Sequence, residues 1–249
     1  MFKLKDERLL RQQCYTNGEW RNAASGATVE VINPSDGAVL GVVPDMGKDG
    51  AAAAVDAADA AWPGWRDRTA GERAEILRRW FDIIMAHQED LAALMTAEQG
   101  KPLSESRGEI AYAAAFVEWF AEEGKRIYGD TIPSHRADTR IVVVKSSVGV
   151  CAAITPWNFP VAIPAGGMLA SLAAGNTVIF KPASAAAMTA WQLCQCFWRA
   201  GVSKNTLQFL PCAGSTVGSQ LTRSPEVDYI ILTGGTDTGM SILEHRPDV

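Results

Sequence analysis

The sequence lacks the features that mark several classes of protein. It has no basic excess, since 23 lysines and arginines stand against 28 aspartates and glutamates, and the net charge of −5 disfavours a nucleic-acid or membrane-surface binder. Its five cysteines follow no spaced framework, which indicates reduced thiols in a cytoplasmic protein. Its three histidines (His87, His135 and His245) lie far apart, so we expect no metal site. The N-terminus has no apolar segment of the secretory type.

Charge is also nearly absent from residues 146–198, where Lys181 is the only charged side chain. Prolines at positions 156, 160 and 164 would interrupt a membrane-spanning helix. A buried parallel sheet that is covered by helices on both faces has the same uncharged composition. We therefore expect a buried core in this stretch and no membrane contact.

The N-terminal part, residues 1–137, combines short strands with helices. Asn17-Gly18 predicts a tight hairpin, and a second strand pair is expected around the Asn33-Pro34 turn. The alanine-rich segment 48–65 predicts a helix that stops at Pro63-Gly64.

Two longer helices and a strand are expected after this segment. Thr69 with Glu72 three residues later forms a capping box, which predicts a helix that ends near Gly100. Pro102 marks the start of the next helix, which runs to about Lys125. Residues 138–148 are rich in β-branched side chains and predict a strand outside the helices.

From residue 149 the pattern becomes regular. Short apolar strands are expected at 149–155, 176–182, 207–211 and 227–234, with helices at about 160–173, 186–201, 213–223 and from 237 onward. This alternation is typical of βαβ units and predicts an α/β fold with a parallel sheet. Ligands of such sheets bind at the carboxyl ends of the strands, so each strand end is a candidate site.

Three of these strand ends carry polar residues or glycines. Asn158, which lies between two prolines, either donates a hydrogen bond to a developing oxyanion or caps the next helix. Lys181 either faces an anionic ligand or reaches out to solvent. The glycine-rich turn 233–239 would let a phosphate approach the next helix, although it lacks the dinucleotide fingerprint.

The segments at these strand ends, ITPWNFP, LAAGNTVIFKPAS and LTGGTDTG, resemble motifs of the NAD(P)-dependent aldehyde dehydrogenase superfamily. NGEW, INP and EQGKPLSE fit the same family, so the resemblance covers nearly the whole chain. It implies the N-terminal half of such an enzyme, with strands and long helices in 1–137, an oligomerisation strand at 138–148 and a Rossmann-like NAD(P)-binding part at 149–249. It also implies a homo-oligomer that acts on a small-molecule aldehyde.

The resemblance also implies roles for single residues. Asn158 matches the residue whose amide stabilises the oxyanion, and Lys181 and Ser184 match the pair at the adenosine ribose. A glutamate at the second of these two positions disfavours a 2′-phosphate in this family, so the serine favours NADP, with NAD as the alternative. The other cofactor contacts that it implies are Ile154 and Trp157 in the cleft, Gly214 and Gly218 near the adenine, and Gly234, Gly235 and Gly239 at the pyrophosphate.

Two departures from the family concern substrate and activity. The chain resembles succinate-semialdehyde dehydrogenases up to about residue 160 and the semialdehyde dehydrogenases of proline catabolism from 161 onward. Gly166-Gly167 replaces the Arg-Lys pair of the former, so succinate semialdehyde is favoured and glutamate semialdehyde is the alternative substrate.

The general-base glutamate and the nucleophilic cysteine of the family have no match in this chain. We therefore do not expect the chain alone to turn over aldehyde. A non-catalytic nucleotide-binding module is the alternative interpretation. Cys212, where the family usually has glycine, has no role that the sequence indicates.

Overall fold

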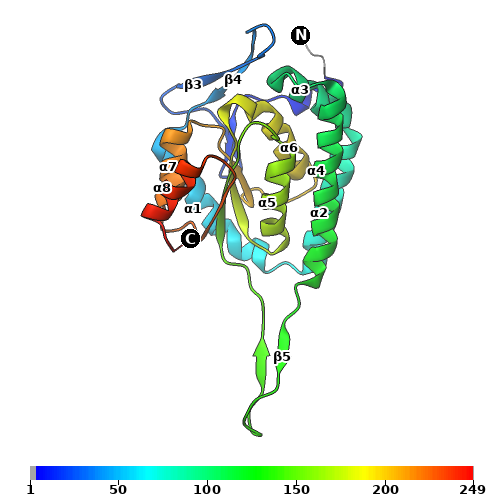
Figure 1. The fold of residues 1–249 in the computed structure, drawn as a ribbon, viewed down its shortest axis with the longest axis vertical. Coiled ribbons are helices and arrows are strands. Elements are labelled where there is room, and N and C mark those ends of the chain that lie inside the picture. The colour runs from blue at the N-terminus through cyan, green and yellow to red at the C-terminus, as the bar shows by residue number, and fades with distance from the viewer. Residues whose placement is uncertain (1–3, 249) are drawn as a thin grey trace.

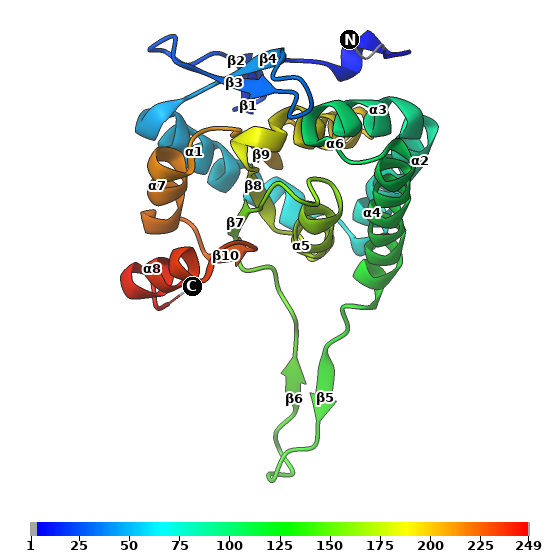
Figure 2. The same ribbon diagram turned by 45° about the horizontal axis from the view of Figure 1, so that its top comes forward.

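The computed structural model describes residues 4–248 (Figure 1). They are built around one six-stranded sheet of order β10-β7-β8-β9-β1-β2, whose strands are labelled in Figure 2. Four strands are parallel: β7 (Val150–Ile154), β8 (Thr177–Lys181), β9 (Leu207–Phe209) and β10 (Tyr229–Leu232). The hairpin of β1 (Cys14–Thr16) and β2 (Glu19–Arg21) continues the sheet antiparallel to β9. The predicted α/β fold with a parallel sheet is confirmed, and the sheet gains an N-terminal hairpin that the sequence did not place there.

Helices cover both faces of the sheet because successive side chains of a strand point to opposite sides. Ala153 and Phe180 belong to a core shared with α5 and α6, whereas Ala152 and Ile179 belong to a core shared with α1 and α7. These helices are α1 (Gly47–Arg66), α5 (Ala162–Ala173), α6 (Ala187–Arg199) and α7 (Ser219–Arg223). Within residues 4–248, none of the helices combines the length and the apolar character that a membrane span requires.

Both predicted N-terminal strand pairs are present. Asn17 and Gly18 have φ angles of 52° and 74°, the left-handed conformation that a two-residue hairpin needs. The second pair, β3 (Thr28–Ile32) and β4 (Val39–Pro44), forms a separate two-stranded sheet. The Asn33 side chain closes the intervening turn by accepting the Ser35 N–H at 2.9 Å.

The expected end of the alanine-rich helix was wrong, because α1 continues through Pro63 to Arg66. Trp65 is fully buried, and its indole N–H donates to the Leu172 carbonyl at 3.0 Å. Packing of this side chain on α5 stabilises the last turn, which outweighs the missing N–H of the proline.

The second expected helix is divided into α2 (Ala70–Ala86) and α3 (Gln88–Gln99), which corrects the prediction of one helix ending near Gly100. The capping box of Thr69 and Glu72 is present, and Gly100 ends α3 in a left-handed conformation. The chain leaves helical geometry only at His87. This break lets α3 contact α6, so tertiary packing overrides a continuous helical pattern.

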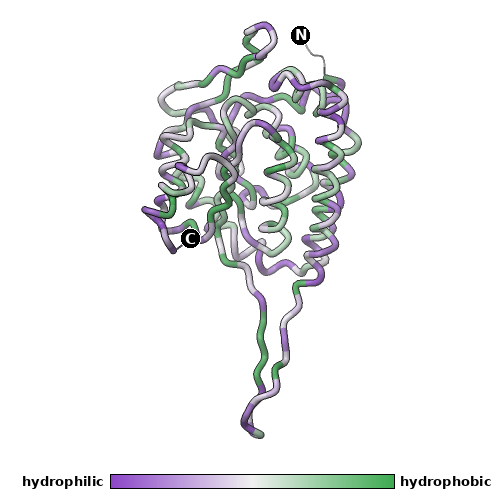
Figure 3. The backbone as a smooth tube through the Cα atoms, viewed as in Figure 1, coloured by the Kyte–Doolittle hydropathy of each residue, from purple (hydrophilic) through white to green (hydrophobic). Residues whose placement is uncertain are grey.

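A long helix, α4 (Leu103–Glu123), follows Pro102 as predicted and leads into a protruding hairpin. The hairpin consists of β5 (Asp130–Ile132) and β6 (Ile141–Val143) and extends away from the body of the molecule (Figure 2). Strand β6 is shorter than the expected 138–148 because only these three residues pair with β5. Apolar residues line this exposed arm, among them Val142 and Val144 (Figure 3).

Candidate functional site

The parallel register places the ends of β7 and β8 side by side. Ile154, the last residue of β7, lies opposite Lys181, the last residue of β8, and the Thr155 N–H donates to the Lys181 carbonyl at 3.2 Å. Thr155 is buried, and its hydroxyl has no hydrogen-bond partner within residues 4–248. This hydroxyl lies at the carboxyl end of a parallel strand, the edge where ligands of such sheets bind.

The loop after β7 presents its side chains to solvent. Trp157 is 61% exposed and Asn158 is exposed, and the Asn158 amide makes no side-chain hydrogen bond within residues 4–248. Helix α5 begins beyond this loop, and its N-cap residue, Val161, provides no side-chain cap. The interpretation of Asn158 as a helix cap is therefore wrong, and its amide remains available to a ligand.

Lys181 is buried at the end of β8 rather than extended to solvent. Its side chain donates to the Pro182 carbonyl at 2.8 Å and to the Cys212 carbonyl at 3.4 Å, and the residue is only 5% exposed. Burial lowers the pKa of its ammonium group below the ordinary value of 10.5. No carboxylate forms an ion pair with it within residues 4–248. The interpretation of a solvent-reaching lysine is wrong, and a buried cation without a counter-ion suits an anionic ligand.

Cys212 connects the two residues that the resemblance places at the ribose. Its carbonyl accepts hydrogen bonds from Lys181 and, at 3.3 Å, from the Ser184 hydroxyl. Its thiol is buried, accepts the Met46 N–H at 3.3 Å and lies 3.9 Å from the Cys14 sulfur. The backbone of Cys212 therefore holds this corner together, although the sequence indicated no role for the residue.

A cavity of about 460 Å³ opens beside this corner. Four of the predicted cofactor residues line it: Ile154, Lys181, Gly214 and Gly218. The glycines belong to a helical turn, Gly214–Gly218, where an added Cβ would lie 3.6–4.0 Å from the Lys181 side chain. The opposite wall comes from α7 and from α8 (Thr236–His245), where Arg223 lies 2.8 Å from the imidazole of His245. Ser184 and Trp157 do not line this cavity.

The glycine-rich turn lies between β10 and α8. Gly235 is the N-cap residue of α8, provides no side-chain cap and has open space where a Cβ would be. An added Cβ at Gly234 or Gly239 would meet the Leu232 side chain at an ordinary van der Waals distance, and none of the three glycines lines the cavity. The turn therefore offers unobstructed backbone at a helix N-terminus, without contacts that require glycine at all three positions.

Three charged residues of the helical part hold these loops, and sequence reasoning missed them. The Glu109 carboxylate accepts the Val161 N–H at the start of α5, and Lys101 pairs with Glu109. Glu98 accepts the backbone N–H groups of Met188 and Thr189 at the start of α6, both at 2.8 Å. Burial raises the pKa of Glu98 to about 7. A glutamate at helical spacing from apolar residues, such as Glu109 four residues before Ala113, was a signal for such a role.

None of the five cysteines is exposed, so none is accessible to a substrate as a nucleophile. The hydrogen bond with Cys14 lowers the pKa of the Cys212 thiol, but this thiol is fully buried. All five are free and buried. Burial raises the pKa of Cys151 to about 11 and that of Cys196 to about 12, which disfavours the reactive thiolate.

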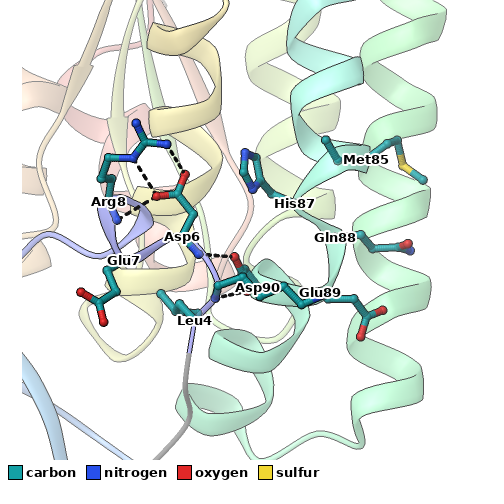
Figure 4. A pocket seen from close by; sticks show the side chains of 11 residues that line it. Leu4, Asp6, Glu7, Arg8, Met85, His87, Gln88, Glu89 and Asp90 are labelled. Atoms are coloured by element: carbon teal, nitrogen blue, oxygen red, sulfur yellow. Dashed lines mark hydrogen bonds and ion pairs between the residues drawn. The ribbon is translucent and has the colours of Figure 1, made fainter.

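A larger hollow of about 900 Å³ lies elsewhere, between residues 4–8 and the junction of α2 and α3 (Figure 4). Two of its carboxylates, those of Asp6 and Asp90, are already engaged within the protein. The Asp90 carboxylate accepts the backbone N–H groups of Lys5 and Asp6, and the Asp6 carboxylate binds Arg8 and Arg199. These contacts anchor the N-terminal segment, so we place the candidate site at the strand ends.

Comparison with known proteins gives a consistent result. The aldehyde dehydrogenase family profile matches residues 20–248. The NADP-dependent succinate-semialdehyde dehydrogenase of Escherichia coli is 52% identical over 97% of this chain and 50% of its own length. A glutarate-semialdehyde dehydrogenase and a 3-sulfolactaldehyde dehydrogenase, both of Pseudomonas putida, are 50% and 45% identical over 97% and 98% of this chain, and each is covered to 50%.

Solved structures agree with this comparison. An NADP-dependent enzyme of E. coli matches with a TM-score of 0.96 and 52% identity, over 98% of this chain and 50% of the other. A succinate-semialdehyde dehydrogenase of Burkholderia pseudomallei matches with a TM-score of 0.97 and 50% identity, over 99% and 52%. The chain thus spans about half the length of the curated relatives that it matches.

Proposed function

The chain belongs to the aldehyde dehydrogenase family, and from this premise we propose that it forms the cofactor-binding part of an enzyme that oxidises an acidic semialdehyde to the carboxylic acid. The family resemblance of the sequence motifs is confirmed by the profile match. Succinate semialdehyde, glutarate semialdehyde and 3-sulfolactaldehyde, named for the relatives, all carry an acid group besides the aldehyde. We favour succinate semialdehyde as the substrate and retain glutamate semialdehyde as the alternative.

The observation that carries the proposal is the buried, uncompensated Lys181 at the wall of the 460 Å³ cavity. A dinucleotide supplies the missing negative charge, and the orphaned Thr155 hydroxyl lies at the same strand ends. The residues therefore fit the group: Lys181 and Ser184 would hold the adenosine ribose, and Gly214 and Gly218 would lie near the adenine. Gly234, Gly235 and Gly239 would leave room for the pyrophosphate, with Ile154 and Trp157 along the cleft.

We favour NADP over NAD. The side chains at the proposed ribose position are a cation and a hydroxyl, and no carboxylate neutralises Lys181 within residues 4–248. A 2′-phosphate adds charge that Lys181 would attract, whereas a carboxylate at position 184 would repel it. The name of the E. coli relative supports the same preference.

The proposed contribution of this chain to the chemistry is binding and charge stabilisation. A bound nicotinamide cofactor would supply the hydride acceptor for oxidation of the aldehyde. Asn158 would donate its amide N–H to the oxygen that gains negative charge when a thiolate attacks the carbonyl. We expect the thiol and the general base from residues outside this chain, because the five cysteines here are buried. The chain alone is then expected to bind NADP without oxidising aldehyde.

The space at Gly166 bears on the substrate. Within residues 4–248, an added Cβ at this position would meet no atom within 4 Å apart from its chain neighbours and the nearby backbone of α5, so α5 presents open space where a charged side chain could have been placed. The group that pairs with the distal acid of the substrate is then expected on another element. This feature keeps the choice between the two semialdehydes open to direct kinetic comparison.

The proposed function also includes a division of the chain into three parts and a role for the protruding hairpin. We propose three parts, residues 1–137, 138–148 and 149–249, in which the second contacts another copy of the protein. The apolar residues Val142, Val144 and Val148 of the second part are exposed, which supports a contact that buries them. The free thiols of all five cysteines support a reducing, cytoplasmic setting.

Titration calorimetry of the chain with NADP tests the proposed function. The wild-type chain is expected to bind NADP, and Lys181→Met is expected to weaken binding roughly 10- to 100-fold, because a charge-assisted hydrogen bond to phosphate is lost. Lys204→Met, which removes an exposed lysine, is the matched control and is expected to bind as the wild type does. Equal affinity for the Lys181 variant and the wild type would contradict the proposed ribose corner.

A further inference from the structure

Lys101 and Glu109 contact the Asn158 loop and the start of α5, and neither lines the cavity. We propose that they are positioning residues that hold the backbone of Asn158, so that its amide meets the reacting carbonyl in one orientation. This inference rests on the function proposed above, which gives Asn158 its role. It extends that function by assigning a task to two residues of the helical part.

Glu109 caps α5 from a distance of more than fifty residues along the chain. One carboxylate oxygen accepts the backbone N–H of Val161 at 2.9 Å and that of Ala162 at 3.2 Å. Helix N-termini are usually capped by a neighbouring Ser, Thr, Asp or Asn, whereas here the carboxylate arrives from α4. The helix that follows the Asn158 loop is therefore fixed to α4 at its first turn.

Lys101 fixes the loop itself. Its ammonium group donates to the other Glu109 oxygen at 2.5 Å and to the backbone carbonyl of Asn158 at 3.0 Å. The same group lies 4.7 Å from the centre of the Phe159 ring, a cation–π contact. The Lys101 ammonium group thus contacts both Asn158 and Phe159, and its contact with Asn158 is to the backbone and not to the side chain.

The arrangement suits positioning better than stability alone. The side chain of Glu109 is 2% exposed and that of Lys101 is 15% exposed, so the pair has lost most of its water. A buried ion pair contributes little net stability compared with an apolar pair of the same size. Its contacts hold the Asn158 carbonyl, the Phe159 ring and the first turn of α5. The Asn158 side chain within this fixed segment is exposed and has no partner within residues 4–248. The result is a fixed backbone that carries an unengaged amide.

Glu98 provides the matched control within the same chain. It accepts the N–H groups of Met188 and Thr189 at the start of α6, as Glu109 does for α5. Substitution of Glu98 should therefore loosen the start of α6 and leave the Asn158 loop unchanged.

The experiment uses the 249-residue chain and needs no turnover. Hydrogen exchange is followed by mass spectrometry at 157–165 and 186–192, and the Asn158 side-chain amide is followed by NMR on asparagine-labelled protein. The variants are Lys101→Met, Lys101→Gln, Glu109→Gln, the rescue variant Lys101→Arg and the control Glu98→Gln. The NADP affinity of each variant is measured in parallel.

We expect Lys101→Met, Lys101→Gln and Glu109→Gln to accelerate exchange at 157–165 roughly 10-fold or more and to shift the Asn158 amide resonance. Lys101→Arg should restore both readouts, and Glu98→Gln should affect 186–192 only. Wild-type exchange at 157–165 in the Lys101 variants, or equal acceleration in both segments, would overturn the proposal. The NADP affinity of these variants should equal that of the wild type. If the wild-type chain itself does not bind NADP, the proposed function is refuted, whereas the hydrogen-exchange result at 157–165 still tests the positioning role.

Discussion

The loops after β7 and β8 begin alike and end in different environments. Each follows a buried parallel strand, and each leads into a helix whose first N–H groups donate to a buried glutamate. Lys181 is 5% exposed, with its ammonium group held by two backbone carbonyls, whereas Asn158 is exposed and its amide has no partner in the part of the chain that the structure describes. At the end of β8, the Lys181 side chain is already fixed where a ligand would bind. In the loop after β7, only the backbone of Asn158 is fixed, and its side chain makes no hydrogen bond within residues 4–248.

This difference follows from what each group has to do in the proposed reaction. A binding corner gains affinity when its groups are fixed before the ligand arrives. A group that stabilises developing charge must be kept free of other partners until the charge appears. The predictions below separate these two requirements, from the largest expected effect to the smallest.

The first prediction concerns Asn158, an exposed residue in the loop after β7. In a complete enzyme containing this chain, Asn158→Ala is expected to lower kcat about 100- to 1000-fold, because one oxyanion donor is lost. The free energy of unfolding of the chain should change by less than about 0.5 kcal/mol, since the side chain is exposed. Kinetics and urea unfolding check the two parts, with the exposed Asn22→Ala as control. A large loss of stability would place Asn158 among the structural residues.

The second prediction concerns Glu98, which accepts the first N–H groups of α6, the helix after β8. Burial raises the pKa of Glu98 from 4.5 to about 7, so between these pH values the folded chain holds a proton that the unfolded chain has lost. Stability from this group is therefore complete below pH 4.5 and decreases as the pH rises to about 7, by about 3 kcal/mol.

Denaturant unfolding of the wild type and of Glu98→Gln at several pH values checks this effect. The glutamine variant cannot ionise, so its stability relative to the wild type should increase between pH 5 and 7.5. The exposed Glu75→Gln, measured in parallel, should show no such trend. A constant difference between Glu98→Gln and the wild type over this range would mean that Glu98 stays in one protonation state.

The third prediction sharpens the description of the β8 corner. Ser184→Glu should shift the ratio of NADP to NAD affinity toward NAD by about 10-fold, because a carboxylate repels the 2′-phosphate. Ser184→Ala, which also removes the hydrogen bond to Cys212 but adds no charge, should retain the NADP preference. Titration with both nucleotides measures the ratio, and an unchanged ratio in Ser184→Glu would move the ribose away from this residue.

Much of the architecture could be predicted from local patterns. The hairpin at Asn17-Gly18, the capping box at Thr69 and the four parallel strands all occur as expected, because turn geometry, capping and apolar periodicity act over a few residues. The end of α1 and the break at His87 were missed. Both depend on packing against elements that are distant in sequence, as the bond from Trp65 to Leu172 illustrates.

For the candidate site too, some features follow from local sequence and others only from tertiary packing. The sequence by itself determined that Asn158 and Lys181 stand at the ends of neighbouring strands, because alternating strands and helices impose a parallel sheet whose carboxyl ends share one edge. Only the tertiary structure decided that Lys181 is buried, that Cys212 joins it to Ser184, and that Glu109 and Lys101 hold the Asn158 loop. These contacts join residues 28 to 57 positions apart, so their existence depends on how whole helices pack and not on any local pattern.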